Sequence, residues 1–425
     1  MTGTTESSSV ADKLLADLTS ETHVTLHPLT IRQEDEEHIV GRVETGEFVA
    51  LPEIGARIIE LLQRGCSLGE VRAQIQEESG VEVALDDFLA SLAELGFVQA
   101  LDGHPVDLSE TPKPNLAWLR AYHVRWLFSW PAQVVYLVLL LAAGLTLIGR
   151  PELFPRYQDF FWSSVSSLVV LGNTAVVMTS IALHELAHLV AARSLDIPAR
   201  IGLGTRLTNL VVQTDVTGLW AVPRRQRYRV YLAGMVWDLL TMAVSLLLLA
   251  YVNLPVVAQN LLEVLVLANF LSLIWQFEFY MRTDIYFAVM DLLRCHNLFG
   301  DSLAYLRYWA RRIGARIISR VTVPAHPLDH LPEHERRKVR LYAWFVLVGS
   351  TVSLTVFAFY GLPILVELFI QAGGSVWRGV ALRRPWLFLD GAVTLVVEGA
   401  FQAGFLITFV KNHKHWFSFL NRLVP

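Results

Sequence analysis

Six apolar stretches constrain this chain more than any other feature of its sequence. They cover residues 132–148, 165–195, 231–252, 256–277, 341–370 and 385–410. A helix of about 20 apolar residues crosses the hydrocarbon core of a bilayer. The composition agrees: 53% of the 425 residues are hydrophobic and 17% are charged, whereas about 25% are charged in a soluble domain. We therefore expect a mainly α fold, a polytopic membrane helix bundle with a transmembrane domain over residues 131–425.

Arginine is concentrated in the loops on one side of this expected bundle. The loops after the second and fourth stretches are rich in arginine, including the basic insertion at residues 296–340, and the other loops have fewer. Because cytoplasmic loops carry the excess of Lys and Arg, these loops are expected in the cytoplasm. Six spans then put both termini on the cytoplasmic side of an inner or plasma membrane. Residues 1–10 are polar, which argues against a cleavable signal peptide.

Charge and cysteine content exclude several classes of protein. The formal net charge of −4 gives no argument for a nucleic-acid partner, because such a partner requires a basic surface. The two cysteines, Cys66 and Cys295, are far apart in the sequence. A disulfide framework or a cysteine-rich zinc site is therefore not expected.

Residues 25–102 have the pattern of a small soluble α+β domain, and residues 1–24 form a weakly patterned tail before it. Helix starts are indicated by a proline and a capping serine, and helix ends by glycines. The domain is expected to be winged-helix-like. The expected elements are two strands around the Thr45-Gly46 turn, helices that begin near Pro52, Ser67 and Leu85, and a short strand at residues 97–99.

The first two of these helices lie in a stretch, residues 51–71, that reads LPEIGARIIELLQRGCSLGEV and continues to Phe88-Leu89 and Gly96-Phe97-Val98. This stretch resembles the PqqD-like peptide-recognition domains found with enzymes that mature ribosomally made peptides. The resemblance implies that a leader peptide adds as a strand to the hairpin edge. A winged helix could instead bind DNA, but residues 34–102 are acidic, the wrong sign for phosphate. The alternative to a peptide-recognition domain is a regulatory winged helix that packs on the membrane part of the chain.

Residues 103–130 are expected to be a linker followed by an interfacial segment. From Trp118 to Trp130, aromatic residues alternate with Arg120, His123 and Arg125. Such mixtures occur where a chain enters a bilayer. Membrane lipid is therefore an expected partner.

The second apolar stretch contains the pattern H-E-x-x-H at His184-Glu185-Leu186-Ala187-His188. Two histidines four residues apart lie on one face of a helix and can reach a single metal ion. Glu185 stands where a carboxylate can take a proton from water at that metal. Each ionisable residue within a membrane-length helix costs a few kcal/mol or more of insertion free energy. Three such residues within five positions are therefore better explained by a functional site than by packing. The metal would lie near the far end of this helix.

A later stretch reads Arg282-Thr283-Asp284-Ile285-Tyr286-Phe287, followed by Asp291-Leu292-Leu293 and Asn297-Leu298. With the H-E-x-x-H helix, it makes the region resemble the site-2-type intramembrane zinc metalloproteases, particularly their peptide zinc metalloprotease branch. The resemblance implies Zn²⁺ held by His184, His188 and Asp284, with Glu185 as the catalytic base. Ile285 stands where that family has glycine, a departure that could alter the local backbone.

Other residues could serve the same site. A hydrolytic zinc ion needs three protein ligands. Asp291, two helical turns beyond Asp284, could be the third ligand instead or could orient a ligand. Asp238 and Glu278 are expected to make polar contacts inside the bundle, with Asp238 a weaker ligand candidate. His296 is expected in solvent near the interface.

Three residues are candidates for substrate binding. In residues 200–216, polar and apolar side chains alternate and many side chains are β-branched. This pattern predicts strands beside the site. An unpaired strand edge near Leu210 and Val211 could hold an extended substrate by backbone hydrogen bonds. Asn269, in the middle of the fourth stretch, could hydrogen-bond across helices or fix the substrate backbone.

Together these patterns predict a membrane-embedded zinc endopeptidase. Its substrate would be a peptide or membrane-associated chain recruited by the N-terminal domain, in the maturation of a ribosomally synthesised peptide. Peptide-modifying or export proteins are further expected partners. The alternative is a non-proteolytic peptide-binding, export or immunity protein that keeps the metalloprotease fold. A membrane-tethered transcription regulator is a third interpretation, which requires the acidic domain to bind DNA.

Overall fold

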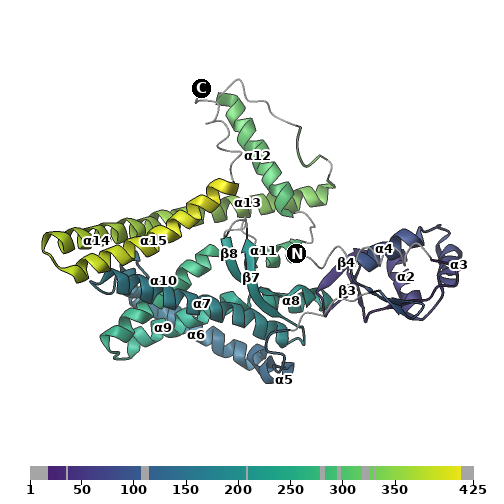
Figure 1. Ribbon diagram of the computed structural model, residues 1–425, viewed down its shortest axis with the longest axis horizontal. Helices are drawn as coiled ribbons and strands as arrows, with labels where there is room; N and C mark the ends of the chain where they lie inside the picture. The colour runs from purple at the N-terminus through teal and green to yellow at the C-terminus, as the bar shows by residue number, and fades with distance from the viewer. Residues whose placement is uncertain are drawn as a thin grey trace. The chain divides into compact units, whose positions relative to one another are not determined.

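The computed structural model shows two compact units, and Figure 1 labels most of their helices and some of their strands. The residues described are 18–34, 37–106, 114–206, 209–277, 283–293, 298–317, 325–329 and 331–412. The first unit comprises Met1–Trp126, Leu189–Ile201 and Thr214–Arg227. The second comprises Leu127–His188, Gly202–Gln213 and Tyr228–Pro425.

The first unit contains a small α+β domain of two antiparallel sheets and three helices. One sheet has the order β2-β3-β4, with β2 at Thr30–Glu34, β3 at Glu37–Arg42 and β4 at Glu47–Leu51. The other has the order β1-β5-β6, with β1 at Val24–Leu26, β5 at Val98–Leu101 and β6 at His104–Pro105. The helices are α2 (Glu53–Gln63), α3 (Leu68–Ser79) and α4 (Leu85–Glu94).

Local signals set the helix boundaries of this domain, as the sequence predicted. Pro52 is the N-cap of α2. Ser67 and Glu70 form a capping box at α3, because the Glu70 side chain accepts from Ser67 N at 2.8 Å and Ser67 Oγ accepts from Glu70 N at 3.4 Å. Gly80 ends α3 with a φ of 68°, which favours glycine. Strands β1, β2 and β6 were not expected. Strands β1 and β6 have only three and two residues, and β1 pairs with β5, which is distant in sequence. Strand β2 pairs with its neighbour β3, and its polar sequence gave no clear strand pattern.

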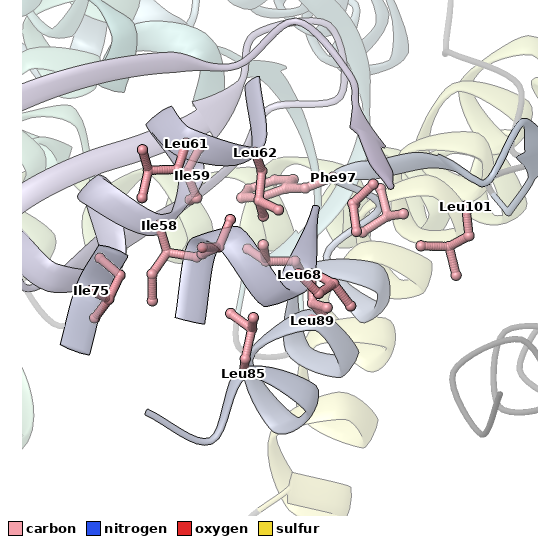
Figure 2. Packing of buried hydrophobic residues seen from close by; sticks show 14 of the residues in the cluster. Ile58, Ile59, Leu61, Leu62, Leu68, Ile75, Leu85, Leu89, Phe97 and Leu101 are labelled. Carbon is pink, nitrogen blue, oxygen red and sulfur yellow. The ribbon is translucent and has the colours of Figure 1, made fainter. Parts of the chain in front are cut away.

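The three helices and strand β5 enclose one apolar core (Figure 2). Each buried Leu, Ile or Phe side chain contributes about 1.5–3 kcal/mol relative to an exposed one. This core belongs to the N-terminal domain alone. Its labelled members are Ile58, Ile59, Leu61, Leu62, Leu68, Ile75, Leu85, Leu89, Phe97 and Leu101.

Two segments that we expected in the transmembrane domain pack in the first unit instead. The short 3-10 helix η4 (Thr217–Ala221) contacts all three strands of the β2-β3-β4 sheet. Arg227, fully buried in helix α8 (Arg224–Tyr231), donates to both carboxylate oxygens of Glu34 at 2.6 and 3.3 Å. Arg224 lies 2.6 Å from the same carboxylate. Two arginines therefore attach the start of α8 to the end of β2.

Among the described residues, six helices are long and apolar enough to cross a membrane, and they match the six expected stretches. Helix α9 packs against α6 and α10, and α14 packs along α15 (Figure 1). The fold is thus mainly helical, with a small α+β domain at its N-terminal end. The candidate spans are Trp130–Gly149 (α6), Ser166–Arg193 (α7), Ala233–Tyr251 (α9), Val256–Trp275 (α10), Glu335–Ala381 (α13 to α14) and Pro385–Gly404, in α15 (Pro385–Asn412).

The fifth candidate span is longer than the sequence indicated. Helix α13 (Glu333–Val356) continues through a π-helical turn, η6 (Phe357–Gly361), into α14 (Leu362–Ala381). Pro363 has no N–H to donate to the preceding turn. A π-helical turn just before this proline lets the helix continue without a break.

Shorter elements connect these spans. Helix α12 fills much of the stretch that we expected to be a polar insertion, and Leu298 at its start is buried against Tyr342 of α13. The strands expected within residues 200–216 are present as a two-stranded sheet. The connecting elements are α5 (Ala121–Val124), η1 (Arg125–Phe128), η2 (Pro151–Leu153), η3 (Tyr157–Phe160), β7 (Arg200–Arg206), β8 (Asn209–Asp215), α11 (Asp284–Leu293) and α12 (Leu298–Ile317).

A carboxylate from the far end of the chain caps α7. Asp390 of α15, which is 5% exposed, accepts hydrogen bonds from Ser166 N at 3.2 Å, Ser167 N at 2.7 Å and Ser167 Oγ at 2.6 Å. The first N–H groups of a helix have no partner within it, and negative charge is favourable there. Asp390 therefore fixes the start of α7 against α15.

Replacement of this cap should destabilise the second unit. We expect Asp390→Ala to lower the free energy of unfolding by about 1–3 kcal/mol, because buried N–H donors lose their acceptor. Thermal unfolding of the purified protein in detergent, followed by helical circular dichroism, measures the loss. Asp390→Asn keeps one acceptor oxygen and should lose less. An unchanged melting temperature in Asp390→Ala would show that the cap is dispensable.

Candidate metal centre

Two histidines of α7 and one aspartate of α11 converge on one point. The Nε2 atoms of His184 and His188 are 3.2 Å apart. Oδ2 of Asp284 lies 3.0 Å from Nε2 of His184 and 3.2 Å from Nε2 of His188. The four-residue spacing puts both imidazoles on one face of α7. Asp284 is the first residue of α11, so the third side chain comes from a distant part of the chain.

The other ring nitrogen of each histidine faces an acceptor. Nδ1 of His188 lies 2.7 Å from the carbonyl oxygen of Val230, which can only accept, so this nitrogen carries the proton. Nδ1 of His184 lies 2.9 Å from Oδ2 of Asp238, a fully buried carboxylate of α9. We assign both imidazoles from these partners as Nδ1–H tautomers. Both Nε2 lone pairs then point toward Asp284.

Three acceptor atoms therefore meet in a buried place. Two neutral imidazoles and a carboxylate at 3.0–3.2 Å repel one another unless a cation lies among them. Zinc–ligand bonds of about 2.0–2.1 Å at the tetrahedral angle separate the ligand atoms by about 3.3 Å. This value is close to all three separations, so the donor set fits a zinc site with three protein ligands.

Gly234 of α9 makes room for the two imidazoles. A Cβ built at this position would collide with Nε2 and Cε1 of His184 and with Nε2 of His188. Asp238 lies four residues further along the same face of α9 and reaches Nδ1 of His184. One face of α9 thus accommodates the ligands and also orients one of them.

Gln276, at the end of α10, holds the third candidate ligand. Its side-chain oxygen accepts a hydrogen bond from Asp284 N at 3.0 Å, and its backbone carbonyl accepts from Thr283 Oγ1 at 2.6 Å. These two bonds fix the backbone at the start of α11 and so orient the Asp284 side chain, whose Oδ2 faces both histidines.

The other predicted site residues that the structure describes lie outside the group formed by His184, His188 and Asp284. Glu185 is half-buried on α7 between the two histidines. Asp291 is buried on α11 but is not a member of the three-residue group. Asn269 of α10 is fully buried, and its Oδ1 accepts from Ser180 Oγ of α7 at 2.8 Å. Asn269 thus makes the cross-helix bond that was one of its two expected roles.

Some predictions are not addressed by these contacts. The side chains of Leu210 and Val211 lie outside the described part of the chain, as do Glu278 and His296. Their roles stay predictions. Ile285 is described: it is the second residue of α11 and has no positive φ. A regular helical backbone therefore accommodates isoleucine where the resembling family has glycine.

Sequence reasoning missed most residues that support the ligands. Ser272 Oγ of α10 donates to Asp238 Oδ2 at 2.8 Å, so two helices fix the carboxylate that faces His184. Gln276 and Gly234 were not expected to take part in the site. The signal they shared was weak, since each is only a small or polar residue within or beside an apolar helix.

Filling the space at Gly234 should abolish the metal site. We expect Gly234→Ala to lose most of its bound zinc, because the added methyl group occupies the position of the imidazoles. Elemental analysis of the purified protein measures the zinc content. Gly144→Ala in α6 is the matched control, because a Cβ there meets nothing within 4 Å. Full zinc content in Gly234→Ala would contradict the geometry of the site.

Loss of the carboxylate behind His184 should weaken metal binding without abolishing it. We expect Asp238→Ala to lower zinc affinity about 10–100-fold, because partners in the outer shell fix the ligand tautomer and orientation. Competition with a chromogenic chelator measures this affinity. Ser272→Ala keeps the carboxylate and should have a smaller effect. Equal affinities for Asp238→Ala and the unaltered protein would show that His184 needs no such partner.

Comparison with known proteins gives one match, and it lies in the N-terminal domain. Residues 37–98 match the family described as coenzyme PQQ synthesis protein D (PqqD). No curated protein and no solved structure matches the chain. The match runs from β3 to the first residue of β5 and contains α2, α3 and α4. The N-terminal domain is therefore PqqD-like, as the sequence predicted.

Proposed function

We propose that this chain is a membrane-embedded zinc endopeptidase that cleaves a peptide recruited by its PqqD-like domain. The observation that carries the proposal is the convergence of three acceptor atoms from His184, His188 and Asp284. Glu185 directly follows the first of these residues, where a general base is needed. The resemblance to site-2-type metalloproteases rests on the same residues and supports the same roles.

The chemistry follows from these residues. Zinc bound by His184, His188 and Asp284 would supply Lewis-acid chemistry, which acidifies water and polarises a peptide carbonyl. The carboxylate of Glu185 accepts a proton from water while the water oxygen bonds to the carbonyl carbon. Glu185 then delivers this proton to the leaving nitrogen as the C–N bond breaks. The products are a new carboxyl end and a new amine.

The PqqD-like domain supports recruitment of a peptide. Strand β4 is an edge of the β2-β3-β4 sheet. An edge strand can pair with an extended peptide through its free backbone groups. We therefore propose that the peptide substrate, or its leader, binds at this edge. Maturation of a ribosomally synthesised peptide is the process that combines such recruitment with cleavage.

The six apolar helices support a location in the inner or plasma membrane. The arginine-rich loops support a cytoplasmic location for both termini and for the end of α7. His188 lies five residues before the end of α7 at Arg193, which corresponds to about 7.5 Å at 1.5 Å per residue. The metal site would therefore be close to the compartment that contains the recruitment domain.

Removal of the base should separate metal binding from turnover. We expect Glu185→Gln to keep zinc and to lose cleavage by at least about 100-fold, because a general base contributes about 10²–10⁴-fold. The assay uses the full chain in lipid nanodiscs with a short precursor peptide as substrate, and mass spectrometry identifies the products. His184→Ala should lose both zinc and cleavage.

Two results would contradict the proposal. Cleavage by Glu185→Gln at the unaltered rate would remove Glu185 from its role as base. Tight peptide binding with no cleavage by zinc-loaded protein would favour the alternative, a non-proteolytic peptide-binding, export or immunity protein. Zinc content and peptide binding are measured on the same preparations, so a loss of folding is recognised.

A further inference from the structure

Three large aromatic side chains project from the segment that precedes α6. Trp118, Tyr122 and Trp126 are 68%, 76% and 64% exposed, and they follow one another at intervals of four residues. The inner side of the same segment is apolar and buried, at Leu119, Ala121 and Val124. Water rarely surrounds so many aromatic rings in a soluble protein without a function. The outer side of this segment therefore requires a partner.

Polar groups accompany these rings. Arg120 and Arg125 are exposed beside them. The His123 ring lies 4.0 Å from the Tyr122 ring and 6.3 Å from the Trp118 ring, measured between centroids. His123 also accepts a hydrogen bond from the Trp126 indole through its carbonyl, at 3.0 Å. The aromatic groups thus form one connected surface with a basic rim.

The segment is bound to the end of α7. Arg193, the last residue of α7 and 7% exposed, donates to Leu119 O at 2.8 Å and to Ala117 O at 3.4 Å. Asp196 accepts from Ala121 N at 3.4 Å. Each bond joins the backbone of the segment to a charged side chain at the end of α7.

Asn115 adds two further bonds at the start of the segment. Its backbone N donates to Ala199 O at 3.0 Å, and its side-chain oxygen accepts from Ile201 N at 2.7 Å. The residues that follow α7 are therefore tied to the aromatic segment along its length. Several hydrogen bonds therefore connect two parts that are distant in sequence.

We infer that residues 115–126 form an interfacial anchor that seats the end of α7 at the anionic surface of the bilayer. The inference rests on the membrane location proposed above. The segment continues directly into η1 and α6, whose Leu137 and Leu141 are 56% and 58% exposed, as lipid-facing residues would be. Tryptophan and tyrosine prefer the headgroup region. Arginine is attracted to anionic headgroups.

The attachment links the anchor to the helix that carries two of the candidate ligands. Arg193, which binds the backbone of the anchor, is the last residue of α7, and His184 and His188 stand earlier in the same helix.

Site-directed spin labelling of the full chain tests this anchor. A nitroxide is attached at Tyr122→Cys in protein carrying Cys66→Ser and Cys295→Ser, reconstituted in vesicles of phosphatidylglycerol and phosphatidylcholine. Collisions with oxygen and with a water-soluble nickel chelate report its depth. We expect a depth within about 10 Å of the boundary between headgroups and acyl chains. Leu141→Cys in α6 is the control for lipid, and Val81→Cys in the N-terminal domain is the control for water.

The controls separate the ways in which the inference can fail. If Leu141→Cys is in lipid and Tyr122→Cys is open to nickel, the anchor is wrong and the membrane location stands. If Leu141→Cys is open to nickel, the membrane location fails as well. If Tyr122→Cys is shielded from both oxygen and nickel, a protein covers the rings and the lipid assignment is overturned.

A second variant tests the attachment to α7. Arg193→Ala removes the donor to Leu119 O and Ala117 O. We expect the Tyr122→Cys nitroxide spectrum to narrow in this variant, because the segment gains mobility, while its depth stays interfacial. Arg150→Ala, outside the segment, should leave the spectrum unchanged. An equally broad spectrum in Arg193→Ala would show that Arg193 does not hold the anchor.

Discussion

The constraint at the centre of the second unit is the mutual repulsion of three acceptor atoms that lie 3.0–3.2 Å from one another. Two imidazoles whose Nδ1 protons are already engaged have no donor to offer a carboxylate. Only a cation, or protonation of a ring, relieves that conflict. The neighbouring contacts fit the first solution: a glycine leaves space for the rings, a separate partner faces Nδ1 of each ring, and Gln276 binds the backbone N–H of Asp284.

Polar residues within the apolar bundle form two layers between α7 and α10. One layer joins Ser180 to Asn269, and the next joins His184 through Asp238 to Ser272. Four residues separate the two α7 positions and three separate the two α10 positions, so each pair shares a helix face. Buried polar groups are costly unless they are paired. The bonds from Ser180 to Asn269 and from Ser272 and His184 to Asp238 offset part of this cost and orient the side chains that they join.

Two segments beyond His188 in the chain belong to the first unit, Leu189–Ile201 and Thr214–Arg227. In the second of these, Arg227 pairs with Glu34 of the PqqD-like domain. In the first, Arg193 at the end of α7 binds the backbone of the aromatic segment. Buried arginines thus hold both segments within the first unit.

The sequence by itself determined the elements whose signals are local. Six apolar stretches predicted six candidate spans because length and hydrophobicity suffice for that inference. Ser67 and Gly80 marked helix ends because caps act within one turn. The four-residue spacing of His184 and His188 set both rings on one face for the same reason. Asp284 was selected by resemblance to a family, and not by spacing.

Only the tertiary structure decided which distant groups meet. Asp238, Gln276 and Gly234 act on the site because α9, α10 and α11 bring them there, and no local pattern distinguishes them from ordinary interruptions of apolar helices. The same holds for Asp390 at the start of α7 and for Glu34 beside Arg227. Contacts across long sequence separations depend on packing, and packing is not encoded in any single stretch of residues.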